Sequence, residues 1–422
     1  MNERLLQFIW QFQYYNTKEP TAVSGEAVKV IYAGLHNTNQ GPDFIEAKIK
    51  IGQTIWVGNV ELHLKTSDWK QHGHHTDPHY NNVILHVVWQ HDETTDAAIP
   101  VLELQSRVSK LLLQQYSEWM NNRNKIPCEK NIIQVAELTW TGWKDRLVAE
   151  RLQRKTQVLK DFLQENNQHW EETFWWMIAR NFGIKVNSEA FEKIARSLPV
   201  TILARHKNQI HQLEALLFGQ SGLLETELQE EYPRLLKREY GFLQKKYKLT
   251  KATLQPLFLR MRPMNFPTVR LAQLAMLIHH SSHLFSQVKE TVSLKEVKKL
   301  LDVTANDYWH YHYRFDEVSS YKEKNLGQSM VDNIIINTIV PVLFAYGMFH
   351  KEQPVKNKAL RWLEETAAEK NSILNYWVQL GISNKNAADS QALIELRTVY
   401  CNKKRCLDCS IGNSLLKRPE IN

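Results

Sequence analysis

Two carboxylates, a histidine and a lysine that could act together lie in the segment GPDFIEAKIKIGQTIWVGNVELHLKTSDW, residues 41–69. Asp43 opens one apparent strand, and Glu61, His63 and Lys65 alternate along the next. Because successive side chains of a strand point to opposite faces, the last three share one face. Carboxylates on neighbouring strands can hold Mg²⁺ or Mn²⁺, and a nearby cation can position water or stabilise developing charge. The segment therefore predicts metal-assisted hydrolysis, with ordinary surface charge on a hairpin as the alternative.

Histidine is concentrated in the same region, because eight of the 17 histidines lie between residues 36 and 91. Neutral imidazole is a common ligand for Zn²⁺, Fe²⁺ or Mn²⁺. We expect residues 67–80 to form a loop beside the hairpin, with His72 and Asp77 as its metal ligands and His74 as a further candidate. No diagnostic spacing such as HExxH is present, so a solvated histidine-rich loop is the alternative.

Three cysteines form a C-x4-C-x2-C pattern in the segment YCNKKRCLDCSIG, and one more cysteine lies about 270 residues upstream. Together they could form a Cys₄ site for Zn²⁺ or a [4Fe–4S] cluster. The alternative is a set of reduced, buried thiols. The four candidate ligands are Cys128, Cys401, Cys406 and Cys409.

Arginines surround two prolines in the segment LRMRPMNFPTVRLAQLA. Guanidinium groups pair well with phosphate, and a neighbouring helix N-terminus favours anions. Caps on helices and pairs with acidic side chains are the alternative interpretation. The candidate phosphate contacts are Arg260, Arg262 and Arg270.

The elements that must position these residues differ between the two ends of the chain. An amphipathic helix is predicted over residues 2–15, where Glu3 could add a further carboxylate. Alternating patterns then predict strands near residues 28–35, 43–51, 54–66, 83–90 and 100–105. Helical spacing follows over residues 107–123, 137–166, 170–182, 188–197, 207–218, 226–247, 267–288, 294–301, 326–347, 355–369, 371–380 and 386–399. We therefore predict an α+β fold, with a mixed-sheet head at 1–106 and a helical body with the cysteine cluster at 107–422.

Bulk composition narrows the class of protein. A chain of 422 residues is long enough for two or three domains. Its net charge of +8 favours a polyanionic partner such as DNA, with a basic surface kept for solubility as the alternative. Four cysteines argue against a disulfide framework. No stretch approaches the roughly 20 apolar residues of a membrane span, so we expect no membrane and a cytoplasmic location.

The hairpin motif resembles that of the PD-(D/E)XK nuclease superfamily, in which the Asp and Glu bind metal and the Lys assists catalysis. This resemblance implies a restriction-endonuclease-like head with Asp43 and Glu61 as metal ligands. His63 stands where that motif has its Lys, and Lys65 follows two residues later. The departure leaves room for a relative that does not cleave. Some members of that superfamily also place one distant and three C-terminal cysteines around a [4Fe–4S] cluster.

A second resemblance extends over nearly the whole chain. The segments GLHNTNQGPDF, VELHLKTSDWKQHGHHTDPHYNNVILHVVWQHD and YCNKKRCLDCSIG resemble a bacterial family of unknown function, the one numbered 2851. This resemblance implies no established activity. The leading hypothesis is therefore a metal-dependent nuclease or phosphodiesterase acting on DNA. The alternatives are a non-catalytic nucleic-acid-binding or scaffold protein on the same fold, and a metallohydrolase based on the histidines.

Overall fold

The computed structural model describes residues 1–94, 99–259, 261–281 and 283–417. As predicted, the fold is α+β, with a mixed sheet near the N-terminus and a long helical region after it. The chain forms two compact units. The first contains residues 1–143 together with those from 396 onward, and the second contains residues 144–395.

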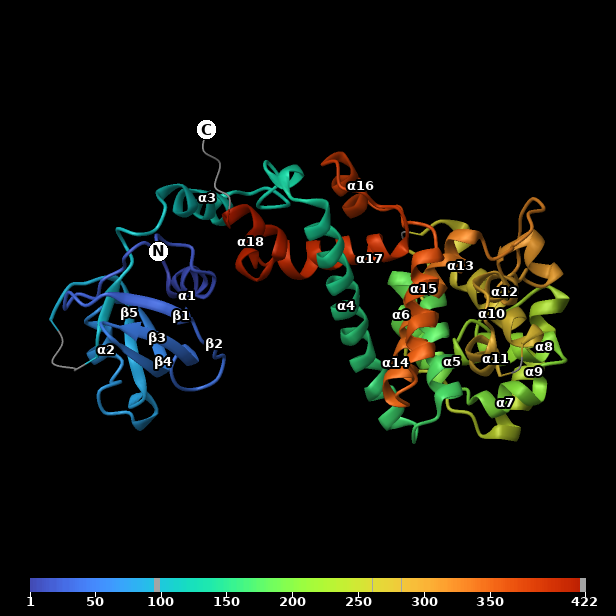
Figure 1. Cartoon of the computed structure of the whole chain (residues 1–422). Helices are drawn as coiled ribbons and strands as arrows, with labels where there is room; N and C mark the ends of the chain where they lie inside the picture. Colours follow the sequence, from blue (N-terminus) through green and yellow to red (C-terminus); the bar gives the residue numbers. More distant parts are fainter. Residues whose placement is uncertain (95–98, 260, 282, 418–422) are drawn as a thin grey trace. The chain divides into compact units, whose positions relative to one another are not determined.

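A six-stranded mixed sheet forms the core of the first unit (Figure 1). The strand order is β1-β3-β4-β5-β6, and β2 pairs with β3. The pairs of β3 are antiparallel, whereas β4, β5 and β6 run parallel to one another. The strands are β1 Val28–Tyr32, β2 Leu35–His36, β3 Phe44–Ile51, β4 Thr54–Lys65, β5 Val83–Gln90 and β6 Val101–Glu103.

Two helical segments flank the central strand β4. Helix α1 (Glu3–Phe12) begins at Asn2, whose side chain accepts a hydrogen bond from the backbone N–H of Leu5. Its apolar face is buried, as expected for an amphipathic helix against a sheet. The connection from β4 to β5 contains helix α2 (Asp68–Gln71) and the 3₁₀ helix η1 (Pro78–Tyr80). Both α1 and α2 contact β4.

A β-bulge interrupts β3 between Phe44 and Ala47, close to Asp43. Phe44 pairs with Val60, but the next aligned pair is Ala47 with Gly58, so β3 has one extra residue. Glu46 takes up the extra length with a left-handed backbone, φ 58°. Bulges change the direction of neighbouring side chains and are common beside active sites.

The rest of the first unit consists of short helices. They are α3 Lys110–Asn121, η2 Ile132–Gln134, the π-helical η6 Leu396–Cys401, η7 Cys406–Asp408 and α18 Ser410–Lys417. Helix α18 packs against α3 and η2, and Arg4 of α1 pairs with Asp408 at 2.5 Å. The compact unit is therefore larger than the head predicted at 1–106, because tertiary contacts add α3 and the C-terminal segments to it.

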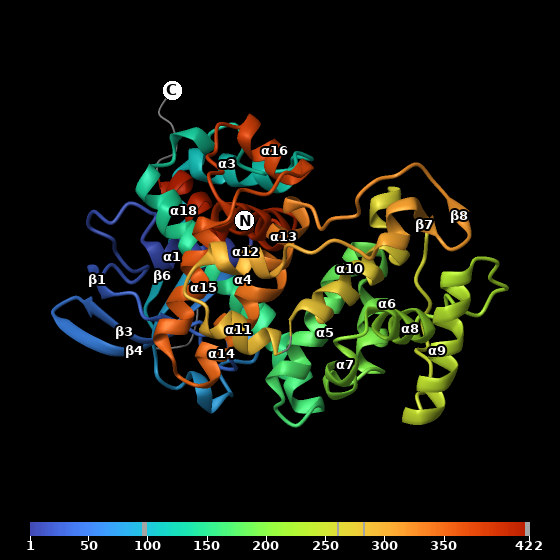
Figure 2. The same ribbon diagram turned by 90° about the vertical axis from the view of Figure 1, so that its right-hand side faces the viewer.

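The second unit is almost entirely helical. Helix α8 packs against both α9 and α10, and α5 packs against α6 (Figure 2). The predicted helix over 267–288 is two helices, because His283 adopts a left-handed backbone, φ 56°. A short β-hairpin and helix α7 were not predicted.

Helix α4 begins within the residues of the first unit and continues into the second. The described helices from α4 onward in this unit are α4 Glu137–Glu165, α5 Trp170–Phe182, α6 Ile184–Arg196, α7 Val200–His206, α8 Ile210–Gln220, α9 Glu231–Tyr247, α10 Pro267–His280, α11 Leu284–Glu290, α12 Leu294–Leu300, α13 Gln328–Ile334, α14 Val340–Phe349, α15 Gln353–Glu365, α16 Ser372–Gln379 and α17 Ala387–Glu395. The remaining elements are η3 Pro263–Asn265, η4 Asp307–Tyr311, β7 His312–Arg314, β8 Glu317–Val318 and the π-helical η5 Ile335–Ile339.

One helical segment among the described residues, Gln328–Phe349, is long and apolar enough to cross a membrane. We expected no stretch of this kind in the sequence, and judged by length and composition alone that expectation was wrong. However, 72% of its most apolar window is buried inside the structure, with a mean hydropathy of 1.5. A largely apolar helical segment that is buried in this way is typical of a protein core.

Candidate metal centre

The structure brings Asp43 and Glu61 together across strands β3 and β4. The backbone N–H of Asp43 donates a hydrogen bond to Oε2 of Glu61 at 3.0 Å. The backbone N–H of Leu62 donates to Oδ2 of Asp43 at 3.1 Å, and the Gln7 side chain of α1 donates to Oδ1 at 2.8 Å. Both oxygens of Asp43 thus have protein donors.

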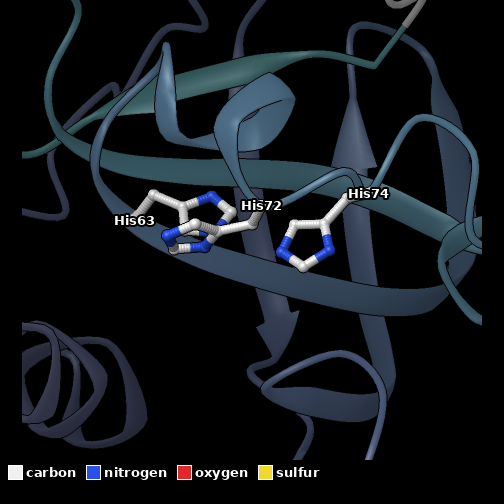
Figure 3. A group of neighbouring side chains, drawn as sticks. All are labelled: His63, His72 and His74. Atoms are coloured by element: carbon white, nitrogen blue, oxygen red, sulfur yellow. The ribbon is translucent and has the colours of Figure 1, made fainter.

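The other oxygen of Glu61 faces a group of histidines. Oε1 of Glu61 lies 3.5 Å from Nε2 of His63 and 3.5 Å from Nε2 of His74. Nδ1 of His72 lies 3.2 Å from Nε2 of His63. One nitrogen from each of the three histidines lies within 4.8 Å of the others, and Figure 3 shows the three rings side by side. We call His63, His72 and His74 the histidine cluster.

Local structure explains why these side chains meet. Glu61 and His63 share one face of β4 because they are two residues apart. His72 and His74 follow α2, and Gly73 between them adopts a left-handed backbone, φ +75°, which glycine adopts without steric cost. The ring of Tyr80 stacks on His74, with centroids 3.8 Å apart. The segment after α2 is therefore held against the strand.

Burial sets the charge state of the cluster. It raises the pKa of both Asp43 and Glu61, and the neighbouring Asp43 carboxylate raises that of Glu61 further. Burial, followed by neighbouring histidines, lowers the pKa of His63 to about 2 and also lowers the pKa of His74. Both imidazoles are then neutral at pH 7, which is the form that binds metal.

The spacing of the atoms fits one divalent ion. A tetrahedral ion with bonds of about 2.0–2.1 Å separates its ligand atoms by about 3.4 Å. The distance of 3.2 Å between Nδ1 of His72 and Nε2 of His63 is close to this value, and the ligand atoms of all three histidines lie within 4.8 Å of one another. The exposed His72 leaves the group open to solvent on one side.

His86 supports the cluster from the neighbouring strand. It pairs in register with Glu61, so that both side chains lie on the same face of the sheet. Its Nε2 lies 2.9 Å from Nδ1 of His63. A partner on the second ring nitrogen fixes the tautomer and orientation of a ligating histidine. The motifs in the sequence do not single out His86 as part of a site, because its place beside Glu61 depends on the register between β4 and β5.

Comparison with known protein families gives one match. Residues 3–372 match a family described as "Protein of unknown function (DUF2851)". The chain belongs to this family. No curated protein and no solved structure matches the chain. The likeness to PD-(D/E)XK nucleases therefore remains a prediction from the hairpin motif. The matched residues of the DUF2851 family contain the whole histidine cluster and end before Cys401.

Two of the predicted residues lie outside the cluster. Lys65 is more than half exposed at the end of β4, and its Nζ lies 3.9 Å from Oδ2 of Asp92. Asp77 accepts hydrogen bonds from the backbone and ring of its neighbour His79, with Oδ1 2.7 Å from the ring Nδ1. Each forms a local pair of its own, so neither contributes a ligand atom to the histidine cluster.

Two of the three predicted phosphate contacts, Arg262 and Arg270, are described in the second unit, and they differ in burial. Arg270 is buried, and donates to Gln273 at 3.0 Å and to Asn265 at 2.6 Å. Burial lowers its pKa to about 10. Arg262 is exposed, and Arg260 lies outside the described residues. We predicted that Arg270 contacts phosphate at a surface, but its side chain is buried in the helical core and hydrogen-bonded there.

The two other candidate sites are separate from the histidine cluster. All four cysteines lie in the first unit, and none forms a disulfide. The second unit contains a cavity of about 330 Å³ with a mostly apolar lining, between Phe174, Leu203 and Leu274. Its carboxylate, Glu171, accepts the backbone N–H of Phe285. This cavity could hold an apolar ligand but has no set of residues comparable to the cluster.

Proposed function

We propose that this chain is a metal-dependent hydrolase of phosphodiesters, with DNA as the substrate. One observation carries the proposal: Oε1 of Glu61 lies 3.5 Å from the Nε2 atoms of both His63 and His74, with His72 in the same group. Buried neutral imidazoles beside a carboxylate are a common arrangement in metal sites that perform hydrolysis.

The histidine cluster would provide the ligands for the ion. Three imidazoles favour Zn²⁺ or a similar transition metal over Mg²⁺, which prefers oxygen ligands. When bound, such an ion polarises a phosphoryl oxygen and lowers the pKa of a bound water. His86 would hold His63 in one tautomer through the 2.9 Å contact between their rings.

Glu61 would act as the general base beside the ion. Its Oε2 is held by the backbone N–H of Asp43, which leaves Oε1 directed at the cluster. Burial, with the neighbouring Asp43, raises the pKa of Glu61 to about 8. A bound cation would lower this pKa toward neutral pH, where the carboxylate can accept a proton from water. Asp43, held by Gln7 and Leu62, would keep Glu61 in place and add negative charge next to the ion.

The choice of substrate rests on charge and access. The chain has a net charge of +8, which favours a polyanion such as DNA. His72 is exposed, so a phosphate group of an extended substrate could approach the cluster from solvent.

The test is hydrolysis of single- and double-stranded DNA by the full chain with Zn²⁺, Mn²⁺ or Mg²⁺, and with EDTA. We expect activity with Zn²⁺ or Mn²⁺ and its loss in EDTA. Because general acid–base catalysis contributes about 10²–10⁴-fold, Glu61→Gln should lower kcat by at least about 100-fold. The double variant His63→Ala/His74→Ala should lose metal binding as well. The matched control is His79→Ala, which removes an exposed histidine of the same segment.

Equal activity in the wild type and in Glu61→Gln would reject the proposal. A second function, binding of DNA without cleavage, would replace it if binding weakened steeply with salt and no metal supported turnover. Full DNA binding by the His63→Ala/His74→Ala variant would support that replacement.

A further inference from the structure

The chain has four cysteines, and the fold gathers all of them in the first unit. Cys128, Cys406 and Cys409 are buried, and Cys401 is half-buried at the end of the π-helical η6. One comes from the segment after α3 and three from the segment between η6 and α18, far apart in sequence. All four cysteines of this chain of 422 residues therefore belong to one compact unit, although one of them is far from the others in sequence.

Hydrogen bonds hold the two cysteine segments against each other. Nζ of Lys404, between Cys401 and Cys406, donates to the carbonyl oxygens of Met120 and Asn122 at the end of α3. The side chain of Asn122 in turn donates to the carbonyl oxygen of Pro127 at 2.8 Å. This chain of contacts links the C-terminal loop, through Asn122, to the residue that precedes Cys128.

The sulfur of Cys409 has donors that suit a thiolate. The backbone N–H groups of Ile411 and Gly412, in the first turn of α18, hydrogen-bond to it, and the indole N–H of Trp143 lies beside it. A helix N-terminus and N–H donors favour a negatively charged sulfur over a neutral thiol. Hydrogen bonds to sulfur are also a regular part of the surroundings of metal-bound thiolates.

Packing of the C-terminal helix brings the cysteine segments together. Helix α18 begins one residue after Cys409 and packs against η2, which begins four residues after Cys128. The backbone of Cys406 lies against the same helix, because a Cβ at Gly412 would lie 2.3 Å from the carbonyl oxygen of Cys406.

The spacing of the sulfurs separates two kinds of metal centre. A single Zn²⁺ with Zn–S bonds of about 2.3 Å holds its sulfurs about 3.8 Å apart. Within the described part of the chain, the histidine cluster is the group of three ligands whose atoms lie within 4.8 Å, and no three of the sulfurs are that close. A wider set of four thiols suits a polynuclear iron–sulfur cluster, which Cys₄ sets also hold.

We propose that Cys128, Cys401, Cys406 and Cys409 hold an iron–sulfur cluster, which joins the segment after α3 to the C-terminal segment. The proposal is independent of the proposed hydrolase function, because none of these residues belongs to the histidine cluster. Loss of the cluster and loss of hydrolysis can therefore be measured separately.

The test is anaerobic purification of the full chain without a histidine tag, followed by measurement of iron, acid-labile sulfide, zinc and visible absorption. Protein purified with empty sites is treated with Fe²⁺ and sulfide under the same conditions. We expect iron and sulfide in the wild type and their loss in Cys128→Ser and Cys406→Ser. His79→Ala is the matched control and should contain as much iron as the wild type.

A variant that keeps all four thiols distinguishes an effect on the cluster from misfolding of the protein. Trp143→Phe removes the indole N–H beside the sulfur of Cys409. We expect it to retain the iron but to show a lower reduction potential, because N–H groups directed at sulfur favour the reduced cluster. The proposal fails if stoichiometric zinc replaces iron, or if the reconstituted wild type takes up no iron. Full iron content in Cys128→Ser would also overturn it.

Discussion

Glu61 has two oxygen atoms with different environments, and this difference defines the candidate centre. A backbone N–H binds one oxygen, and two imidazoles face the other. Because the carboxylate is buried, water cannot replace these protein partners if they are removed. A side chain fixed in this way can act on one bound group without first having to reorganise.

Substitutions of His86 test whether its contact with His63 contributes to metal binding. We expect His86→Phe to weaken Zn²⁺ binding about 10–100-fold, because Nδ1 of His63 loses its partner. His86→Gln is the matched variant: it can restore a hydrogen bond and should recover part of the affinity. Titration calorimetry of the full chain measures both. Equal affinity in His86→Phe and the wild type would contradict a supporting role for His86.

Glu214 gives a prediction on pH and stability in the second unit. It is fully buried and accepts hydrogen bonds from Tyr232 at 2.7 Å and Trp309 at 3.2 Å. Burial raises its pKa from 4.5 to about 7. The folded state therefore binds the proton more tightly than the unfolded state does. This contribution to stability is fully present below pH 4.5 and is lost as the pH rises through about 7.

Between pH 5 and 8, this group should lower the free energy of unfolding by about 3 kcal/mol. Glu214→Gln carries no titrating proton, so its stability should decline less over the same range. Urea unfolding at a series of pH values measures the difference between the two proteins. Parallel pH profiles would show that Glu214 is ionised in the folded protein throughout.

Single residues show where prediction from the sequence succeeds. Alternation along one strand placed Glu61 and His63 on a common face, and the short antiparallel connection placed Asp43 beside them. Gln7 reaches the site through the packing of α1, which local patterns do not encode. The predicted loop after α2 brings His74 to the site, whereas Asp77 pairs with His79 instead. Lys65 shares the face but lies at the end of the strand, where Asp92 offers a closer partner.

At the scale of elements, α18 shows how tertiary packing creates a helix that the sequence does not predict. Gly412 and Asn413 are poor helix formers, and the helix is only eight residues long. It forms against α3 and η2, with Asn413 accepting a hydrogen bond from Tyr14 at 2.5 Å. By contrast, the longer helices and the strands were predicted well, because hydrophobic periodicity is strong over many residues.

Gly412 permits the close contact between α18 and the cysteine loop. A Cβ at this position would lie 2.3 Å from the backbone carbonyl oxygen of Cys406. We expect Gly412→Ala to destabilise the first unit by about 1–3 kcal/mol and to lower its iron content, because the loop must move away. The matched control is Gly142→Ala in α4, where a Cβ meets nothing within 4 Å and should be neutral or slightly stabilising.

Thermal unfolding and iron analysis of the two glycine variants give the comparison. Unchanged iron content and stability in Gly412→Ala would contradict the close packing of the loop on α18.

For the whole molecule, the division into two compact units predicts two unfolding transitions. Leu216, fully buried in α8, lies in the second unit, and Leu→Ala at such a site costs about 2–5 kcal/mol. We expect Leu216→Ala to lower one transition in scanning calorimetry, and removal of iron or Cys401→Ser to lower the other. A single transition shifted by both changes would contradict independent units.

The first unit contains residues from before and after the second, so the second is an insertion within it. During translation, the ribosome releases the sheet and α1 long before the segment that carries Cys401, Cys406 and Cys409. The sheet is therefore synthesised before the C-terminal segments that belong to the same unit, and the entire helical unit is made in between. Arg4 and Tyr14 can meet Asp408 and Asn413 only at the end of this process. Premature termination before residue 401 would thus leave the N-terminal region incomplete, although its own codons had been read in full.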